Sequence, residues 1–269
     1  MRLISICPSN TELLHYLGLT HMLVGVDDFS DWPKEIQNLP KLGPDLQIDM
    51  DKVEKLEPDL VLASLSVPGM EKNIEELKKR NIPYIVLNPQ SLKDIEKDLL
   101  SLGKITNTKA KAMEVTDCMN ELIHTYKELA ATIPSKTKVY WEWWPKPVFT
   151  PGKINWLTEI SELAGATNVF ADKNVASHQT DWEEVAEKNP DVICMIWVGV
   201  KESKMKPAHV KKRPGWEENV AAVKENKIFC LEEALFCRPS PRLLHGLKKV
   251  AHLLHPDIYP TNTKDDPLL

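Results

Sequence analysis

One sequence pattern occurs twice in this chain, and no other feature constrains its fold as strongly. The pattern is D-x-[D/E]-x-V-x4-P-D followed by aliphatic residues, and its copies run from Asp49 to Asp59 and from Asp181 to Asp191. A second pair of segments, 11–20 and 158–167, shares a T-E-[L/I] start and a G-x-T end in the same chain order. These repeats predict two lobes that are built alike. We expect two such lobes to hold a ligand between them.

Strands and helices alternate in both halves of the chain. Short, mainly apolar runs at 3–6, 60–63 and 192–198 lie between turn residues, which is typical of buried strands in a parallel sheet. Strands separated by helices imply parallel pairing through crossover connections. The expected fold class is therefore α/β, with two similar Rossmann-like lobes and a parallel central sheet in each.

One segment between the halves differs from the rest. Residues 107–133 contain neither glycine nor proline, and their apolar residues recur mostly every three or four positions. This pattern predicts one helix of roughly 38 Å. We expect it to be a spine helix (107–133) that joins an N-terminal α/β lobe, residues 1–106, to a C-terminal α/β lobe, residues 134–269.

Composition and motifs exclude several classes of function. The net charge of −5 gives no reason to expect a nucleic-acid partner. No stretch reaches the roughly 18 apolar residues of a membrane helix. The sequence has no Walker loop, G-x-S-x-G or G-x-G-x-x-G motif, so we do not expect an enzyme. The eight histidines form no spaced ligand set, so we expect neither a metal site nor a resident cofactor.

The start of the chain leaves its location open. The apolar run before Pro8 is too short for a secretory leader. The protein is expected in the cytoplasm if Met1 is the native start, and outside it as a lipoprotein-type protein if a leader was removed. The five cysteines include no C-x-x-C pair, which favours reduced thiols. Cys118 and Cys194 are expected to be small core residues.

The opening segment 4–12, ISICPSNTE, resembles the start of class III solute-binding proteins of ABC importers. Further matching fragments follow in the family's order, at 24–33, 56–61, 147–153, 164–170 and 238–242. Members of this family bind vitamin B12, siderophores or haem, and this chain is most similar to the vitamin B12-binding members. The resemblance implies a monomer that captures a corrinoid in an interlobe cleft and delivers it to a dimeric ABC permease. It would be peripheral to the membrane if exported.

The aromatic residues of segment 138–144, KVYWEWW, are the first candidates for ligand contacts. Strand alternation places Trp141 and Trp143 on one face, and Tyr140, Glu142 and Trp144 on the other. One face is expected to be core, and residues past the end of the strand can reach a ligand. A flat corrin needs broad apolar surfaces, and one aromatic side chain buries about 150–250 Å².

The resemblance implies a set of ligand-binding residues from both lobes. The aromatic members are Phe29, Trp143 and Phe149, with Trp32 as a further candidate, and packing in the core is the alternative role of each. The implied polar members are Ser9, Glu233 and Arg238. Arginine can donate to amides around a corrin and glutamate can accept from them, whereas a buried structural ion pair is the alternative for Glu233 and Arg238.

The chain departs from the family pattern at three positions that hold tryptophan in other members. They are Asp45, Ser64 and Ser177 here. A more polar wall of this kind favours a different corrinoid or a ferric siderophore. Haem binding by a protein of the same fold is another alternative. A cytoplasmic corrinoid carrier or sensor without a transport role is a further alternative.

The repeated acids Asp51 and Glu183 have two interpretations. Acids in the first turn of a helix stabilise it by about 0.3–1 kcal/mol through the helix dipole. The resemblance implies instead that one exposed carboxylate per lobe docks onto arginines of the two permease subunits. The family usually has glutamate at both positions, and Asp51 is one methylene shorter.

Segment 201–213 is rich in lysine and has no clear periodicity. We expect a solvated, mobile loop there. The alternative is a basic rim that attracts an anionic ligand.

Overall fold

The computed structural model describes residues 1–261 and 265–269, and the chain divides into two compact units. The first unit comprises Met1–Pro89, Lys93–Met119 and Leu268–Leu269, and the second comprises Gln90–Leu92 and Asn120–Pro267. The division falls inside one helix, α5 (Lys109–Ala131). This helix has 23 residues and accounts for the long helix expected between residues 107 and 133.

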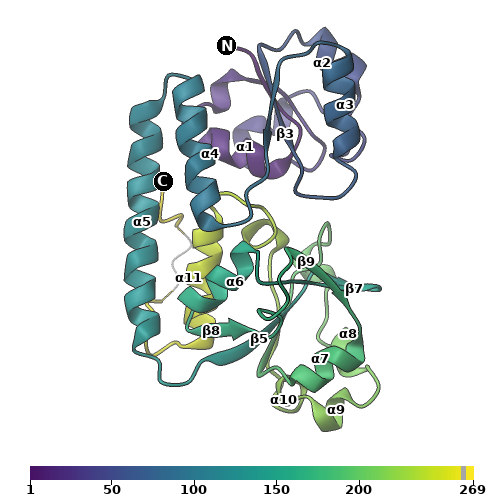
Figure 1. Ribbon diagram of the computed structural model, residues 1–269, viewed down its shortest axis with the longest axis vertical. Helices are drawn as coiled ribbons and strands as arrows, with labels where there is room; N and C mark the ends of the chain where they lie inside the picture. The colour runs from purple at the N-terminus through teal and green to yellow at the C-terminus, as the bar shows by residue number, and fades with distance from the viewer. Residues whose placement is uncertain (262–264) are drawn as a thin grey trace. The chain divides into compact units, whose positions relative to one another are not determined.

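The first unit is built on a four-stranded parallel sheet (Figure 1). Its strands are β1 (Leu3–Ser5), β2 (Leu23–Val26), β3 (Leu60–Ser64) and β4 (Tyr84–Leu87). The connecting helices are α1 (Pro8–Tyr16), η1 (Thr20–Met22), η2 (Lys34–Asn38), α2 (Met50–Lys55), α3 (Glu71–Lys79) and, after the last strand, α4 (Leu92–Ile105). The strand order is β2-β1-β3-β4, and β3 pairs with β1 from Leu3↔Leu60 onward.

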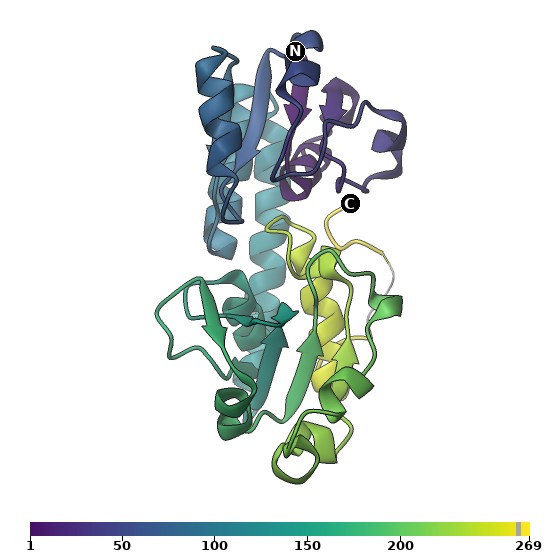
Figure 2. The same cartoon turned by 90° about the vertical axis from the view of Figure 1, so that its right-hand side faces the viewer.

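The second unit contains a parallel sheet of the same size, whose strands run side by side in Figure 2. These strands are β5 (Thr137–Glu142), β8 (Ala166–Asn168), β10 (Val192–Met195) and β11 (Ile228–Cys230). An additional antiparallel sheet consists of β6 (Trp144–Pro145), β7 (Val148–Pro151) and β9 (Ser177–Thr180). The helices are α6 (Trp156–Leu163), α7 (Trp182–Lys188), η3 (Glu202–Lys204), α8 (Ala208–Lys211), α9 (Trp216–Asn219), α10 (Ala221–Lys224), η4 (Glu233–Leu235) and α11 (Leu243–Leu254).

The two parallel sheets share one topology. Counted in chain order within each unit, both run second, first, third, fourth, because the second sheet has the order β8-β5-β10-β11. The predicted α/β class with two similar parallel-sheet units is therefore confirmed. Apolar side chains from strands and helices form the core of each unit, around Ile4, Val53 and Val61 in the first and Tyr140, Val185 and Ile193 in the second.

The sequence repeat corresponds to the same structural motif in each unit. Its first aspartate is the N-cap of a short helix, because Asp49 accepts from the Lys52 N–H at 3.1 Å and Asp181 from the Glu184 N–H at 2.8 Å. The last aspartate of the repeat hydrogen-bonds a residue in or next to the neighbouring strand, and so links that strand to the one that follows the repeat. Asp59 Oδ2 accepts the Arg2 N–H at 2.6 Å.

Asp191 repeats this last contact in the second unit, where its Oδ2 accepts the Lys138 N–H at 2.8 Å. The second pair of similar segments, 11–20 and 158–167, also has a structural basis. Gly18 and Gly165 end α1 and α6 at φ of +73° and +70°, a left-handed conformation that glycine adopts without steric cost. The aspartates and glycines of both sequence repeats thus fix the backbone at equivalent places in the two units.

Helices α4 and the first part of α5 pack closely in the first unit, and they run alongside each other in Figure 1 and Figure 2. Gly103 permits this approach, since a Cβ added there would lie 2.5 Å from the Cβ of Ala112. One of two expectations about cysteine burial differs from the structure. Cys118 is exposed on α5 rather than a core residue, because it lies on the solvent side of that helix, whereas Cys194 is buried in β10 as expected.

The lysine-rich segment 201–213 is exposed over most of its length, in agreement with the expected solvated loop, and its mobility stays a prediction. The segment contains η3 and α8, and Arg213 at its end is only 4% exposed. Burial of a guanidinium requires a partner, and the partner is Glu142, which is fully buried in β5. Both faces of β5 are therefore covered, since Tyr140 and Trp141 are also fully buried.

Candidate functional site

In the first unit, a tight turn presents Phe29 to solvent. The carboxylate of Asp27 accepts the N–H groups of Phe29 at 2.8 Å and Ser30 at 3.0 Å, and it also accepts the Ser30 hydroxyl at 2.5 Å. Lys41 Nζ donates to the Ser30 carbonyl at 2.6 Å. The Phe29 side chain remains 50% exposed, so an aromatic ring projects from a braced backbone.

Asp27 itself is buried beneath this turn. Loss of hydration raises the pKa of its carboxyl to about 6, although the hydrogen bonds from Ser30 and the Phe29 N–H act in the opposite direction. The Ser30 hydroxyl also lies 2.8 Å from Thr11 Oγ1, which donates to Ser5 Oγ at 2.8 Å. A chain of buried polar groups thus joins the turn to β1.

Trp32 and Ser9 are less exposed to solvent than Phe29. Trp32 is half-buried, and its ring packs edge-on against His15 at 4.4 Å between centroids and tilted against Tyr16 at 5.7 Å. Ser9 is buried in the first turn of α1, with its hydroxyl 3.3 Å from Cys7 Sγ. Burial raises the pKa of the Cys7 thiol, which favours its protonated form.

In the second unit, the antiparallel sheet positions the predicted aromatics Trp143 and Phe149. Phe149 lies in β7 opposite Trp144 of β6 and Gln179 of β9, and its carbonyl accepts the Trp143 N–H at 2.9 Å. Both Trp143 and Phe149 are half-buried. Within residues 1–261 and 265–269, the buried indole Nε1 of Trp143 has no hydrogen-bond partner, which is unusual for an indole donor.

The polar pair Glu233 and Arg238 is in direct contact. Arg238 Nη2 lies 3.2 Å from Glu233 Oε2, with side-chain exposures of 9% and 19%. Glu233 begins η4, and its carbonyl accepts the Cys237 N–H at 2.8 Å. The short turn therefore brings the two side chains together from positions five residues apart.

Sequence reasoning missed the Glu142–Arg213 cluster, which organises the second unit. Glu142 accepts two hydrogen bonds from Arg213, at 2.6 and 2.7 Å, and one from Tyr140 Oη at 3.0 Å. Trp197 Nε1 donates to its other oxygen at 3.0 Å. The available signal was an arginine at the end of a lysine-rich run, because arginine is the cation suited to buried two-point contacts.

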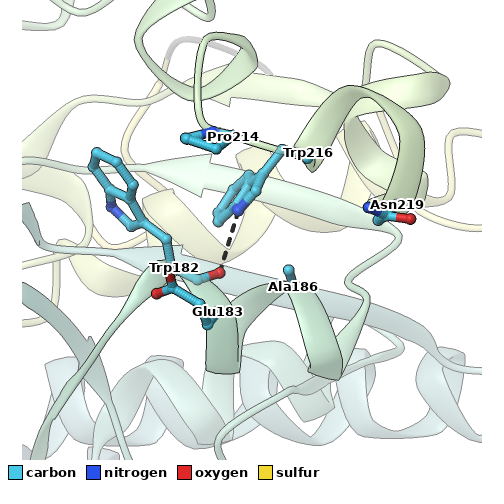
Figure 3. Close-up of a pocket in the computed structure, with 7 residues that line it drawn as sticks. Trp182, Glu183, Ala186, Pro214, Trp216 and Asn219 are labelled. Carbon is cyan, nitrogen blue, oxygen red and sulfur yellow. Dashed lines mark hydrogen bonds between the residues drawn. The ribbon is translucent and has the colours of Figure 1, made fainter.

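The two predicted docking acids occupy different environments. Asp51 is 73% exposed, yet its carboxylate is 2.6 Å from Arg80 Nη1. Glu183 is exposed at the edge of a small pocket that is also lined by Trp182, Ala186 and Trp216 (Figure 3). Both acids follow a capping aspartate by two residues, as the repeat predicts.

Within residues 1–261 and 265–269, no three or more His, Cys, Asp or Glu side chains form a cluster suited to a metal ion. Over the same residues, no helix combines the length and apolarity needed to cross a bilayer. The five cysteines are all free thiols.

Comparison with known proteins places the chain in a family. A model of the periplasmic binding protein family matches residues 3–235. The chain belongs to this family. It is 32% identical to an uncharacterized ABC transporter substrate-binding lipoprotein of Bacillus subtilis, over 96% of this chain and 81% of that protein. It is 26% identical to a vitamin B12-binding protein of Vibrio parahaemolyticus, over 93% of this chain and 87% of that protein.

The fold of a periplasmic binding protein also agrees with solved structures. A periplasmic haem-binding protein of Pseudomonas aeruginosa superposes with a TM-score of 0.84, covering 99% of this chain and 96% of that one at 21% identity. At this identity the likeness establishes the fold alone. The family membership confirms that the chain is a substrate-binding component of an ABC importer, which binds a ligand and works with a permease. It also agrees with the expectation that the protein is not an enzyme.

Proposed function

We propose that this periplasmic binding protein captures a corrinoid of the cobalamin type and delivers it to an ABC permease. Both units contribute side chains to the ligand in this proposal. The relative from Vibrio parahaemolyticus, which is named for vitamin B12, supports a corrinoid over an amino acid, a sugar or a bare metal ion.

The exposed ring of Phe29 is the observation that carries the proposal. A half-exposed phenylalanine on a turn held by three hydrogen bonds to Asp27 is costly to leave in water and loses little entropy when a ligand covers it. A large, flat and partly apolar ligand matches such a surface. Phe149 and Trp143 would supply the aromatic contacts of the second unit, and Trp32 would be a further aromatic contact of the first.

Polar groups would orient the ligand. Arg238 and Glu233 offer donors and an acceptor to the amide groups around a corrin. The unpartnered Nε1 of Trp143 would gain an acceptor from the ligand, which would remove the cost of a buried donor without a partner in the described chain. Ser9 would contribute through a small rotation of its hydroxyl.

A ferric siderophore or haem is the second candidate for the ligand. The observation that favours it is the polar character of Asp45, Ser64 and Ser177, three positions at which the family resemblance implies tryptophan. Arg238 would then pair with a negatively charged oxygen instead of an amide. A ligand of either class would be carried by the same substrate-binding fold.

A fluorescence titration separates these ligands. The purified protein is titrated with cyanocobalamin, haemin and a ferric catecholate siderophore while tryptophan emission is followed. Saturable quenching by cyanocobalamin at micromolar concentration or below, which is lost in a Phe29→Ala/Phe149→Ala variant, is the expected result. Quenching by haemin or the siderophore alone would replace the corrinoid with the second candidate.

The partner in this proposal is a permease dimer that contacts Asp51 and Glu183. Exposed charges of this kind steer and orient a complex more than they tighten it. The Asp51→Lys/Glu183→Lys double variant should lose association with the cognate permease complex in nanodiscs and keep its ligand affinity. Glu187→Lys changes an exposed acid elsewhere on α7 and is the matched control. If the double variant still associates, the two acids serve only their helices, and a carrier without a transport role becomes the better description.

A further inference from the structure

Four buried side chains form a continuous line of hydrogen bonds beneath the exposed turn of the first unit. Asp27 Oδ2 lies 2.5 Å from Ser30 Oγ, which lies 2.8 Å from Thr11 Oγ1. Thr11 Oγ1 donates to Ser5 Oγ at 2.8 Å, and Ser5 Oγ donates to the Cys7 carbonyl at 3.0 Å. We call the side chains of Asp27, Ser30, Thr11 and Ser5 the Asp27 network, and all four are buried.

A count of hydrogens shows that the Asp27 network is complete only with an added proton. Its contacts need one hydrogen each, and the three hydroxyl groups supply one hydrogen fewer than the contacts require. If Asp27 is ionised, Ser30 donates to the carboxylate and Thr11 donates to Ser5. Neither hydroxyl then has a hydrogen left for the contact between Ser30 and Thr11. Reversing Thr11 and Ser5 instead would leave the Cys7 carbonyl without the Ser5 hydrogen.

A protonated Asp27 removes this shortage. Its Oδ2–H donates to Ser30, Ser30 donates to Thr11, and the two remaining bonds keep the directions that the structure gives them. Each buried hydroxyl of the network then both donates and accepts. Because a buried polar group without its hydrogen bond is unfavourable, the arrangement of the network favours the acid form of Asp27.

The other oxygen of the same carboxyl holds the backbone of segment 27–30, which we call the Phe29 turn. Asp27 Oδ1 accepts the Phe29 N–H at 2.8 Å and the Ser30 N–H at 3.0 Å. These two bonds form in either protonation state, because the proton would be on Oδ2. The proton sets instead the direction of the Ser30 hydroxyl, and through Thr11 and Ser5 it joins the turn to α1 and β1.

The surroundings of Asp27 also favour a protonated carboxyl. Lys41 Nζ donates to the carbonyl oxygens of Ser30 at 2.6 Å and Asp27 at 3.3 Å, and in the described part of the chain no cation pairs with the carboxyl itself. Burial raises the pKa of Asp27 to about 6, and the negative charge of Asp45 acts in the same direction. Burial likewise raises the pKa of the Cys7 thiol, which favours its uncharged form.

We infer that Asp27 is a positioning residue for ligand capture, and that its protonated form holds the Phe29 turn in the conformation that binds the ligand. The inference rests on the proposed role of Phe29 as a ligand contact. A ligand that covers Phe29 keeps water away from the turn, which disfavours ionisation of the carboxyl beneath it. Ligand binding and proton binding at Asp27 therefore strengthen each other by the same factor.

The proton on Asp27 can be measured without any ligand. In protein labelled with ¹³C and ¹⁵N, the Asp27 carboxyl signal and the amide signals of Phe29 and Ser30 are followed as the pH changes. We expect all three to titrate together near pH 6. Thr11→Val removes one hydroxyl contact, so Ser30 can donate to an ionised carboxylate without leaving a contact unfilled. This variant should lower the titration midpoint by at least about half a pH unit.

The coupling to the ligand is tested by fluorescence titration with cyanocobalamin. We expect the natural chain to bind at least about threefold more weakly at about pH 7.5 than at about pH 5. Asp27→Asn imitates the protonated acid, because its Oδ1 accepts the two N–H groups and its Nδ2 donates to Ser30. It should bind at both pH values as the natural chain binds at the lower one. Asp28→Asn, at the exposed neighbouring residue, should keep the pH dependence of the natural chain.

A pH dependence that persists in Asp27→Asn would overturn the inference, as would an affinity of this variant at the higher pH that does not exceed that of the natural chain. A titration midpoint that Thr11→Val leaves in place would show that the hydrogen count does not hold the proton. Absence of cyanocobalamin binding at either pH, with the Phe29 turn still titrating as expected, would refute the proposed ligand and leave the proton site standing. Binding of cyanocobalamin without titration of the turn would refute the proton site alone.

Discussion

Arg213 and Glu142 form a two-point ion pair inside the second unit, with Nη1 2.6 Å from Oε2 and Nη2 2.7 Å from Oε1. Their side chains are 2% and 0% exposed. Glu142 ends β5, whereas Arg213 closes the lysine-rich segment that leads to α9. The pair therefore anchors that segment, which leads to Trp216, to the central sheet.

Breaking this pair on one side should destabilise the protein strongly. Arg213→Met leaves a buried carboxylate without its cation, and the expected loss is about 3–5 kcal/mol in the free energy of unfolding. Urea denaturation followed by circular dichroism measures this loss. The double variant Glu142→Gln/Arg213→Met should lose less than the sum of the single variants.

Lys212→Met is the matched control for this cycle, because Lys212 is the exposed neighbour of Arg213. It should change the free energy of unfolding by no more than about 0.5 kcal/mol. Additive losses in the double variant would show that the two side chains stabilise the fold independently.

The pH dependence of stability should show one transition in the acid range from Glu184. Lys173 at 2.8 Å, with Thr180 and His178, lowers the pKa of Glu184 from 4.5 to about 2. The ionised form is favoured by folding, so its contribution is complete above about pH 4.5 and is lost as the pH falls towards 2. Thermal melts should show a smaller decline over this window in Glu184→Gln. An equal decline in both proteins would contradict the assignment.

The Asp27 carboxyl should make stability change with pH in the direction opposite to that of Glu184. Burial raises its pKa from 3.8 to about 6, so the folded protein holds a proton that the unfolded chain has released between these two values. Stability should therefore fall as the pH rises from about 4 to about 6 and then level off. Asp27→Asn should remove this component while Asp28→Asn, at the exposed neighbouring residue, retains it. Denaturation midpoints measured at half-unit pH steps provide the comparison.

Replacement of Phe29 should separate binding from stability. Because its ring is 50% exposed, Phe29→Ala should change the free energy of unfolding by less than about 0.5 kcal/mol. The affinity for cyanocobalamin should fall about tenfold, which corresponds to about 1.4 kcal/mol. Met113→Ala removes an apolar side chain of similar exposure, 47%, from α5, where no ligand contact is proposed, and should leave the affinity unchanged. Calorimetric titration of both variants decides whether Phe29 is a ligand contact.

Much of the fold was predictable because it depends on local signals. The aspartates at positions 49 and 181 cap helices in any context that allows a helix, and the prolines at 58 and 190 end them. The glycine-free and proline-free run from 107 to 133 is sufficient to specify α5. Family membership was likewise visible in short fragments, since each encodes a turn or strand end that the fold requires.

Burial and pairing of charged side chains were not predictable in the same way. Arg213 stands beside Lys212 in the sequence, and apart from the choice of arginine over lysine nothing local distinguishes the buried cation from the solvated one. Asp51 and Glu183 occupy equivalent places in the repeat, yet only Asp51 has an arginine of its own chain. That difference depends on Arg80, a residue 29 positions away from Asp51.

The sequence by itself determined that this protein has two units of one topology, and that it belongs to a family of substrate-binding proteins. Hydrophobic spacing, caps and turn residues act over a few positions, and these features repeat visibly along the chain. Only the tertiary structure decided which acids are neutralised, that Phe29 projects from a braced turn, and that a pocket adjoins Glu183. Those properties arise from contacts between residues distant in sequence. In the low-polarity interior, a single hydrogen-bond or ion-pair partner largely determines whether a polar or charged group is stable.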